Sequence, residues 1–346
     1  MIDPIIPSNA LWVKFSGVPQ PAGVLPVLCF FIARGVSCWV YMNAIFLREF
    51  AAALQLSREK GVGAAAFRRL LDLCGMPSLA LEHWLASAGH NKPMSRQSRQ
   101  KSATAAMIEI AVEKVASGEM QGCYYSQSGY PSQLNDLGEP PPVLFSSSAI
   151  RPAKFAAVVG ARKLSIEAVQ PACEMVRQLV AEGYAIVSGG AEGADAIALK
   201  QSLDLGAYTA AVFATGLDVI YPAANIGLFE TIKHSGVLLS EMMPGARPQR
   251  SFFPARNRII AALADVVAVI QAGENSGSLI SAAWASRLGR RLLVLPPPND
   301  ADPAWAGNRR LIEAGAGVFH AGGKAFSVAE PVKDFFAAGE QLFTGF

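Results

Sequence analysis

Short apolar runs alternate with segments of helical periodicity through the middle of the chain, from residue 155 to residue 295. The runs are rich in β-branched and small apolar residues, which is typical of strands that are buried on both faces of a parallel sheet. The predicted strands are residues 155–159, 184–187, 208–214, 237–240, 265–271 and 292–295. Because helical segments separate these strands, we predict an α/β fold with a doubly wound, mainly parallel sheet.

The first two predicted strands each end in a turn of small residues. Residues 160–163 (Gly-Ala-Arg-Lys) follow the first strand, and residues 188–193 (Ser-Gly-Gly-Ala-Glu-Gly) follow the second. Such turns direct free backbone N–H groups and a helix N-terminus towards one crevice, which suits an anion such as phosphate. Ser165 takes the N-cap position of the helix between them, and Pro171 is expected to kink that helix or confine its regular pairing to the C-terminal part.

The N-terminal third is helical in pattern. Residues 47–88 show helical spacing around a turn with Gly61 and Gly63, which resembles a helix-hairpin-helix whose N–H groups can meet a phosphate. A plain helical connector is the alternative. Residues 91–103 are basic and contain no acid, so they form a solvated linker or a basic arm. We divide the chain into an unassigned extension (1–41), a small helical domain (42–90), a basic linker with a helix (91–120), a sheet domain (121–325) and a C-terminal tail (326–346).

The composition narrows the classes of function. Of the 346 residues, 51% are hydrophobic and 16% are charged, as expected of a well-buried α/β protein. The formal net charge of +3 is modest, so a polyanionic partner would need a local basic patch. The five cysteines lack C-x-x-C spacing and the four histidines are far apart, so we expect neither disulfides nor a metal or other cofactor. The apolar stretch 24–33 is too short to span a membrane, and we predict a cytoplasmic protein without membrane contact.

A second basic segment, residues 247–258, interleaves four arginines with two phenylalanines and contains no acidic residue. Arg and Lys side chains bind the phosphates of single-stranded DNA, while its bases stack on aromatic rings. We therefore expect this segment to share one crevice with Arg162, whose planar guanidinium can engage phosphate oxygens in bidentate fashion. Two structural alternatives stay open, namely Phe253 as a core anchor and Arg258 as a partner of Asp218 or Asp265.

Six short motifs occur in the order found in the DprA/Smf family. They are Tyr130-Pro131-x-x-Leu134, Gly160-Ala161-Arg162, Ser188-Gly189-x-Ala191-x-Gly193-x-Asp195, Gly216-Leu217-Asp218-Val219-Ile220-Tyr221-Pro222, Phe253-Pro254-x-Arg256-Asn257-Arg258-Ile259-Ile260 and Ser276-Gly277-Ser278-Leu279. Over residues 47–319 the chain resembles these DNA-processing factors of natural transformation. The resemblance implies an extended Rossmann-like core that binds and protects incoming single-stranded DNA, forms a homodimer, and helps to load the RecA recombinase. It also implies that the leading helical segment is a sterile-alpha-motif-like domain.

The chain departs from the family pattern at several positions. Glu192 stands where the family usually has arginine, and Leu199, with Lys200 beside it, stands where histidine is usual. A carboxylate in a phosphate crevice would repel phosphate. The tail after Phe319 is too short for the winged-helix domain that some members carry. The candidate DNA and phosphate contacts are Gly160, Arg162, Lys163, Ser188, Gly189, Lys200, Arg247, Arg250, Phe253, Arg256, Asn257, Arg258, Ser276, Gly277 and Ser278.

An enzyme acting on a nucleotide-like small molecule is the alternative function. Phosphoribohydrolases related to cytokinin-activating enzymes resemble this fold, but they carry a Pro-Gly-Gly-x-Gly-Thr turn followed by a catalytic glutamate. The corresponding turn here, residues 274–278, is followed by no acid in residues 279–281. Glu192 and Glu241 remain as possible general bases. We predict no catalytic residue and no enzyme, with nucleotide hydrolysis and a protein-interaction scaffold without DNA binding as alternatives.

Overall fold

The computed structural model describes residues 38–87, 97–320 and 331–332. The chain divides into two units, Met1–Phe46 and Leu47–Phe346, and every described strand belongs to the second. The predictions for the N-terminal extension before residue 38, for the first residues of the basic linker and for nearly all of the C-terminal tail lie outside the described residues.

A nine-stranded sheet organises this unit, in the order β1-β2-β6-β5-β4-β3-β7-β8-β9. The strands are β1 (Gln121–Tyr124), β2 (Val143–Ser146), β3 (Phe155–Val159), β4 (Ala185–Ser188), β5 (Thr209–Phe213), β6 (Val237–Ser240), β7 (Ala264–Val269), β8 (Arg291–Val294) and β9 (Gly317–Val318). Neighbours from β3 to β9 pair in parallel, whereas β1–β2 and β2–β6 pair antiparallel. The chain starts the parallel part at β3, builds outwards to β6, and returns to the other side of β3 with β7. This confirms the predicted doubly wound, Rossmann-like, mainly parallel sheet.

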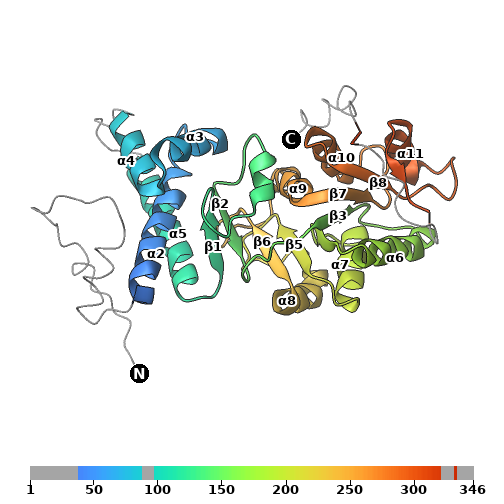
Figure 1. The fold of residues 1–346 in the computed structure, drawn as a ribbon, viewed down its shortest axis with the longest axis horizontal. Helices are drawn as coiled ribbons and strands as arrows, with labels where there is room; N and C mark the ends of the chain where they lie inside the picture. The colour runs from blue at the N-terminus through green and yellow to red at the C-terminus, as the bar shows by residue number, and fades with distance from the viewer. Residues whose placement is uncertain (1–37, 88–96, 321–330, 333–346) are drawn as a thin grey trace, which may run out of the picture. The chain divides into compact units, whose positions relative to one another are not determined.

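Helices cover both faces of the sheet. Figure 1 shows α6, α7 and α8 on one face, and α9 and α10 on the other. The helices are α2 (Cys38–Leu56), α3 (Ala64–Cys74), α4 (Pro77–Ser87), α5 (Gln97–Ala116), α6 (Ile166–Ala181), α7 (Ala194–Asp204), α8 (Ile226–Ser235), α9 (Phe252–Leu263), α10 (Ser278–Arg287) and α11 (Ala306–Glu313). Helix α6 begins after Ser165 as predicted, although the Ser165 hydroxyl makes no capping hydrogen bond, and it runs through Pro171.

The core lies between the sheet and these helices. All five residues of β3 are buried, since a central parallel strand is covered on both faces. Successive side chains of a strand point to opposite faces, and Ala156 and Val158 accordingly pack in the same cluster as Met175 and Leu179 of α6. Burying side chains of the size of Val158, Met175 and Leu179 stabilises the fold by about 1.5–3 kcal/mol each. This packing holds β3, and therefore the turn that follows it, in a fixed position.

The second half of the arginine-rich segment, from residue 252, forms the start of a helix that we did not predict. Residues 252–263 form α9, and the chain passes directly from α9 into β7 at Ala264. Pro254 lies in the first turn, where its missing N–H has no intrahelical partner in any case. Ile259 and Ile260 are buried at this helix. The charged residues in its first half obscure the apolar periodicity of its second half.

The N-terminal helical pattern is confirmed. Helices α2 and α3 are joined by a short turn in which Gly61 has a φ of +91° and a Cβ there would lie 3.6 Å from the Trp84 ring. Arg68 of α3 donates hydrogen bonds of 3.3 Å to the backbone oxygens of Asn135 and Leu137. The phosphate-binding role of this turn stays a prediction.

The structure also bears on the cysteines, on metal-ligand groups and on membrane-spanning helices. Cys74, Cys123 and Cys173 are free thiols. In the described part of the chain, no group of three or more His, Cys, Asp and Glu residues is placed to hold a metal ion. No helix among the described residues has the length and apolar character needed to cross a bilayer.

Candidate functional site

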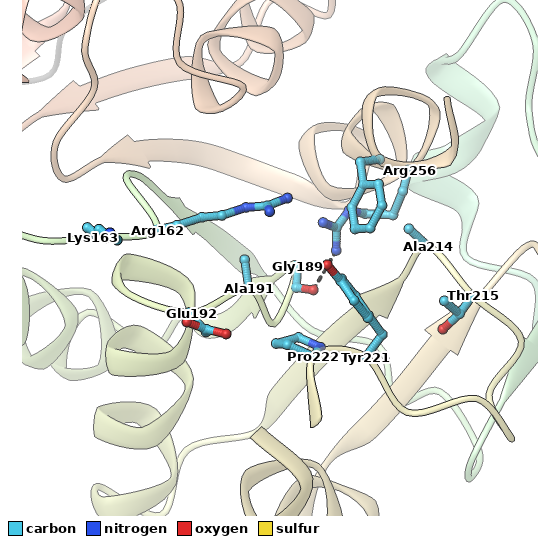
Figure 2. A pocket seen from close by; sticks show the side chains of 11 residues that line it. Arg162, Lys163, Gly189, Ala191, Glu192, Ala214, Thr215, Tyr221, Pro222 and Arg256 are labelled. Atoms are coloured by element: carbon cyan, nitrogen blue, oxygen red, sulfur yellow. Dashed lines mark hydrogen bonds between the residues drawn. The ribbon is translucent and has the colours of Figure 1, made fainter. Parts of the chain in front are cut away.

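A cavity of about 190 Å³ lies where β3, β4 and β5 end. The carboxyl ends of parallel strands meet at one edge of a sheet, so turns that are far apart in sequence converge there. Residues from those turns, from the loop after β5 and from α9 line the cavity (Figure 2): Arg162, Lys163, Gly189, Ala191, Glu192, Ala214, Thr215, Tyr221, Pro222, Phe253 and Arg256. The structure thus brings together five of the predicted contacts, namely Arg162, Lys163, Gly189, Phe253 and Arg256.

The rim of the cavity is basic and aromatic. Arg162 and Lys163 are exposed in the turn after β3. The guanidinium of Arg162 lies 5.6 Å from the ring centroid of Phe253, within the range of a cation–π contact. The Phe253 ring in turn meets Tyr221 edge to face, at 5.7 Å between centroids. Tyr221 is 40% exposed, so the rim offers water both a cation and an aromatic face.

Arg256 belongs to the floor of the cavity. It is only 5% exposed, and its Nη1 donates hydrogen bonds to the backbone oxygens of Gly189, at 2.6 Å, and Val212. Burial lowers the pKa of Arg256 to about 10, and the carboxylate of Asp195 opposes that shift. The Arg256 side chain therefore ties the turn after β4 to strand β5 and to helix α9.

Asp195 fills the anion site that the turn after β4 would otherwise offer. Its Oδ2 accepts hydrogen bonds from the backbone N–H groups of Gly189, at 3.2 Å, and Ala191, at 3.3 Å. Burial raises the pKa of Asp195, and Arg256 and these N–H groups lower it. In the turn after β3, the N–H of Ser165 likewise donates to Oε1 of Gln271, at 2.9 Å.

The prediction that these turns present free N–H groups is therefore wrong for Gly189, Ala191 and Ser165. Each of these amides donates to an acceptor within the protein. A bound anion would be met by the side chains of Arg162 and Lys163, which are the exposed cations of the cavity.

The serine turn after β7 lies outside the cavity lining. Ser276, Gly277 and Ser278 follow β7, which pairs with β3 on the side away from β4 and β5. Asn257 connects the two regions, because its Nδ2 donates to the Gly277 oxygen at 3.2 Å. The hydroxyls of Ser276 and Ser278 bond to each other at 2.7 Å. Their role as phosphate contacts stays a prediction.

Five further predicted contacts lie outside the cavity lining. The Ser188 hydroxyl is buried and donates to the Val158 oxygen at 2.6 Å. Gly160 packs closely, since a Cβ there would lie 2.7 Å from the Cβ of Ala194. Lys200 pairs with Asp204 along the exposed side of α7, at 2.7 Å. Arg247 and Arg250 are exposed in the loop before α9.

Arg258, a candidate phosphate contact, forms an ion pair within the protein, although not with Asp218 or Asp265 as its structural alternative had it. It pairs with Glu241 at 2.5 Å, and neither side chain is more than 15% exposed. Burial raises the pKa of Glu241, and Arg258 opposes that shift. Asp218 instead accepts from the Gly245 N–H at 2.7 Å and lies 3.7 Å from Lys114. Glu241, which directly follows β6, was not predicted as the partner because separation along the sequence does not give the distance between β6 and α9.

Tyr221 and Thr215 line the cavity, although neither was chosen as a contact. Both lie in or next to the motif that follows β5, and this motif was the available signal. The Thr215 hydroxyl donates to the Val219 oxygen at 2.7 Å, so it shapes the loop that carries Tyr221. Glu192 also lines the cavity, at the position where it departs from the family pattern.

Gly193→Ala is expected to lower the free energy of unfolding by about 1–3 kcal/mol and to displace the turn that carries Arg162. Gly193 has a φ of +78°, and a Cβ there would lie 2.4 Å from the backbone oxygens of Ala161 and Arg162. Backbone atoms at that distance must move. Gly138→Ala is the control, because a Cβ at Gly138 would meet nothing within 4 Å. Urea unfolding of the two variants measures the difference in stability. Equal stability of the two variants would contradict the prediction.

Comparison with known proteins gives the same fold and the same core region. The sequence model of the family "DNA recombination-mediator protein A" matches residues 121–329, more than half of the chain. The chain is 32% identical over 256 residues to the DNA processing protein DprA of Bacillus subtilis, which covers 69% of this chain and 86% of that protein. It is 39% identical over 195 residues to protein Smf of Synechocystis sp., covering 55% and 49% respectively. The chain thus spans about half the length of the Synechocystis relative.

Two solved structures are similar. DNA processing protein A of Streptococcus pneumoniae matches with a TM-score of 0.62 and 29% identity, over 78% of this chain and 93% of that one. DNA processing protein A of Helicobacter pylori, whose structure addresses its single-stranded DNA binding mode, matches with a TM-score of 0.52 and 32% identity, over 58% and 92%. The chain therefore belongs to the DNA recombination-mediator protein A family, the DprA/Smf proteins.

Proposed function

We propose that this protein binds single-stranded DNA at the cavity described above, as a DNA-processing protein of natural transformation. The observation that carries the proposal is the rim, where exposed Arg162 stacks on Phe253 beside the exposed ring of Tyr221. A cation and an aromatic face at one place are what a single strand requires, because it presents phosphates and unpaired bases together.

The size of the cavity favours a part of a polymer over a free small molecule. Its volume of about 190 Å³ is below the roughly 300–1,000 Å³ typical of small-molecule sites. Such a cavity suits one phosphate or one base. In a duplex the bases are stacked on one another, so they are not free to stack on Tyr221 or Phe253.

The basic residues extend the proposed path beyond the cavity. Arg247 and Arg250 are exposed in the loop before α9, which also carries Phe253. A DNA strand bound at Arg162 and Phe253 would meet these two further cations in the loop before α9. Binding through phosphates gives affinity that depends little on sequence and falls with salt.

The finer parts of the proposal rest on the family. We propose that the protein protects incoming single strands, forms a homodimer, and helps to load the RecA recombinase in the cytoplasm. Mass measurement by light scattering tests the dimer, and the rate of RecA filament growth on strands coated by a single-strand-binding protein tests the loading.

Of the two candidate general bases for an enzyme, Glu192 and Glu241, one forms an ion pair within the protein. Glu241 pairs with Arg258 and is largely buried, so it is not placed to accept a proton from a substrate in the cavity. Glu192 remains at the cavity, with no second carboxylate and no histidine among the lining residues. We therefore propose binding, and not hydrolysis, as the activity.

Preference for single strands is the test of the proposed function. We expect tighter binding to a single strand than to a duplex of the same length and sequence, since only the single strand offers bases to the aromatic rim. Fluorescence anisotropy titrations at matched salt concentrations measure both affinities. Equal affinities for the two forms would refute the proposal.

A further inference from the structure

Glu192 is an exposed carboxylate on the wall of a cavity that otherwise presents cations and aromatic rings. Figure 2 shows the side chains of Glu192 and Arg162 extending from two neighbouring turns, those after β4 and β3. Its carboxylate forms no hydrogen bond or ion pair with any other residue in the described ranges, in contrast to the buried Asp195. The acceptor capacity of Glu192 is therefore available to a ligand.

A carboxylate and a guanidinium that line one cavity favour different parts of a nucleotide. The phosphate is attracted to Arg162 and repelled by Glu192. An ionised carboxylate only accepts hydrogen bonds, so the group next to Glu192 must be an N–H donor. In a single strand, the N–H donors belong to the bases, whose Watson–Crick edges are free.

Guanine matches a carboxylate best among the four bases. Its Watson–Crick edge places the N1–H and the N2 amino group side by side, so that both can donate to the two oxygens of one carboxylate. In adenine and cytosine the amino group has a ring acceptor beside it, and in thymine the single N–H lies between two carbonyls. Those three bases would each place an acceptor against the carboxylate.

The aromatic rim supplies a face for that base. One face of Phe253 is covered by the Arg162 guanidinium at 5.6 Å, whereas Tyr221 is 40% exposed. Tyr221 and Glu192 both line the cavity, whose volume is about 190 Å³. A base that stacks on Tyr221 can thus turn its edge towards Glu192 while the adjoining phosphate meets Arg162.

We propose that Glu192 is a specificity-determining residue that accepts two hydrogen bonds, from N1–H and N2–H of an unpaired guanine in the bound strand. This inference rests on the proposed function and adds a preference for one base at one position. The phosphate contacts remain independent of sequence, and guanine at this position tightens binding about fivefold to tenfold, the lower part of the range for a two-bond base contact.

The probes are short oligothymidylates that differ at one central nucleotide. We expect the strand with one dG to bind about fivefold to tenfold tighter than the all-thymidine strand. Deoxyinosine keeps N1–H and lacks the N2 amino group, so it should lose most of that gain. Deoxy-7-deazaguanosine changes only the opposite edge and should keep the gain.

Glu192→Gln separates base recognition from charge. The amide offers one acceptor in place of two equivalent oxygens, so the dG strand should lose its advantage. Affinity for the all-thymidine strand should not fall, because a repulsion with phosphate is removed. Glu230→Gln, which removes an exposed charge from α8 outside the cavity lining, is the matched control and should keep the preference for dG.

The outcomes separate this inference from the proposed function. Failure of every oligonucleotide to bind would refute both. Binding of all strands with equal affinity would refute the role of Glu192 alone, as would a preference for dG that survives Glu192→Gln. Unfolding of each variant in urea, compared with the unmodified protein, shows that any change in affinity does not come from loss of folded protein.

Discussion

Replacement of Arg256 by methionine is expected to lower the free energy of unfolding by about 1–3 kcal/mol for each buried backbone acceptor that it leaves without a donor. Arg256 is 5% exposed and Asp195 is 7% exposed, so the carboxylate left behind has little access to water. The backbone oxygens of Gly189 and Val212 also lose their donor. Methionine retains the apolar stem, so the loss would come from the guanidinium.

Urea unfolding followed by circular dichroism measures this change. Arg250→Met is the control, because Arg250 is exposed and its replacement should alter stability by less than about 0.5 kcal/mol. The double variant Asp195→Asn with Arg256→Met should be more stable than the sum of the two single losses predicts. If Arg256→Met were no less stable than the control, a structural role for Arg256 would be excluded.

Arg162→Ala is expected to behave in the opposite way. Arg162 is exposed at the cavity rim, so its loss should change the free energy of unfolding by less than about 0.5 kcal/mol. If Arg162 neutralises one phosphate, the slope of log affinity against log salt concentration for a single strand should fall by about 0.7. Affinity should decrease by a similar factor for all sequences, since a phosphate contact reads no base.

Titrations with an oligothymidylate at several salt concentrations give that slope. Lys233→Ala is the matched control, because Lys233 is an exposed cation on α8 that does not line the cavity and is not among the candidate contacts. We expect the control to keep the slope of the unmodified protein. An unchanged slope for Arg162→Ala would remove the phosphate contact from the proposed function.

The positions of the parallel strands were readable from the sequence because each parallel strand is a short apolar run between helices. The predicted run 237–240 coincides with β6, and the run 155–159 coincides with β3. Helix α9 was missed because its first half carries Arg256 and Arg258, whose charges hide the helical spacing. Antiparallel pairing of β1 and β2 was also missed, since no strand was predicted before residue 155.

The site was partly predictable for a different reason. Arg162 and Gly189 follow consecutive strands of a parallel sheet, and topology alone brings such turns together. Topology does not distinguish an exposed arginine from a buried one, and so Arg162 and Arg256 appeared equivalent. Nor does it reveal that Asp195 satisfies the amides of its own turn, which depends on hydrogen bonds of 3.2 and 3.3 Å.

The internal carboxylate of Asp195 has a kinetic consequence. A turn whose backbone N–H groups have no acceptor within the protein is often flexible in the free state. Ordering such a turn on binding slows association and weakens affinity. Here Gly189 and Ala191 already donate to Asp195, and Arg256 holds the same turn from the other side. Under the proposed function, no ordering of this turn is therefore needed before a strand binds. Association should be set by diffusion and by attraction to the exposed arginines, and it should slow steeply as ionic strength rises.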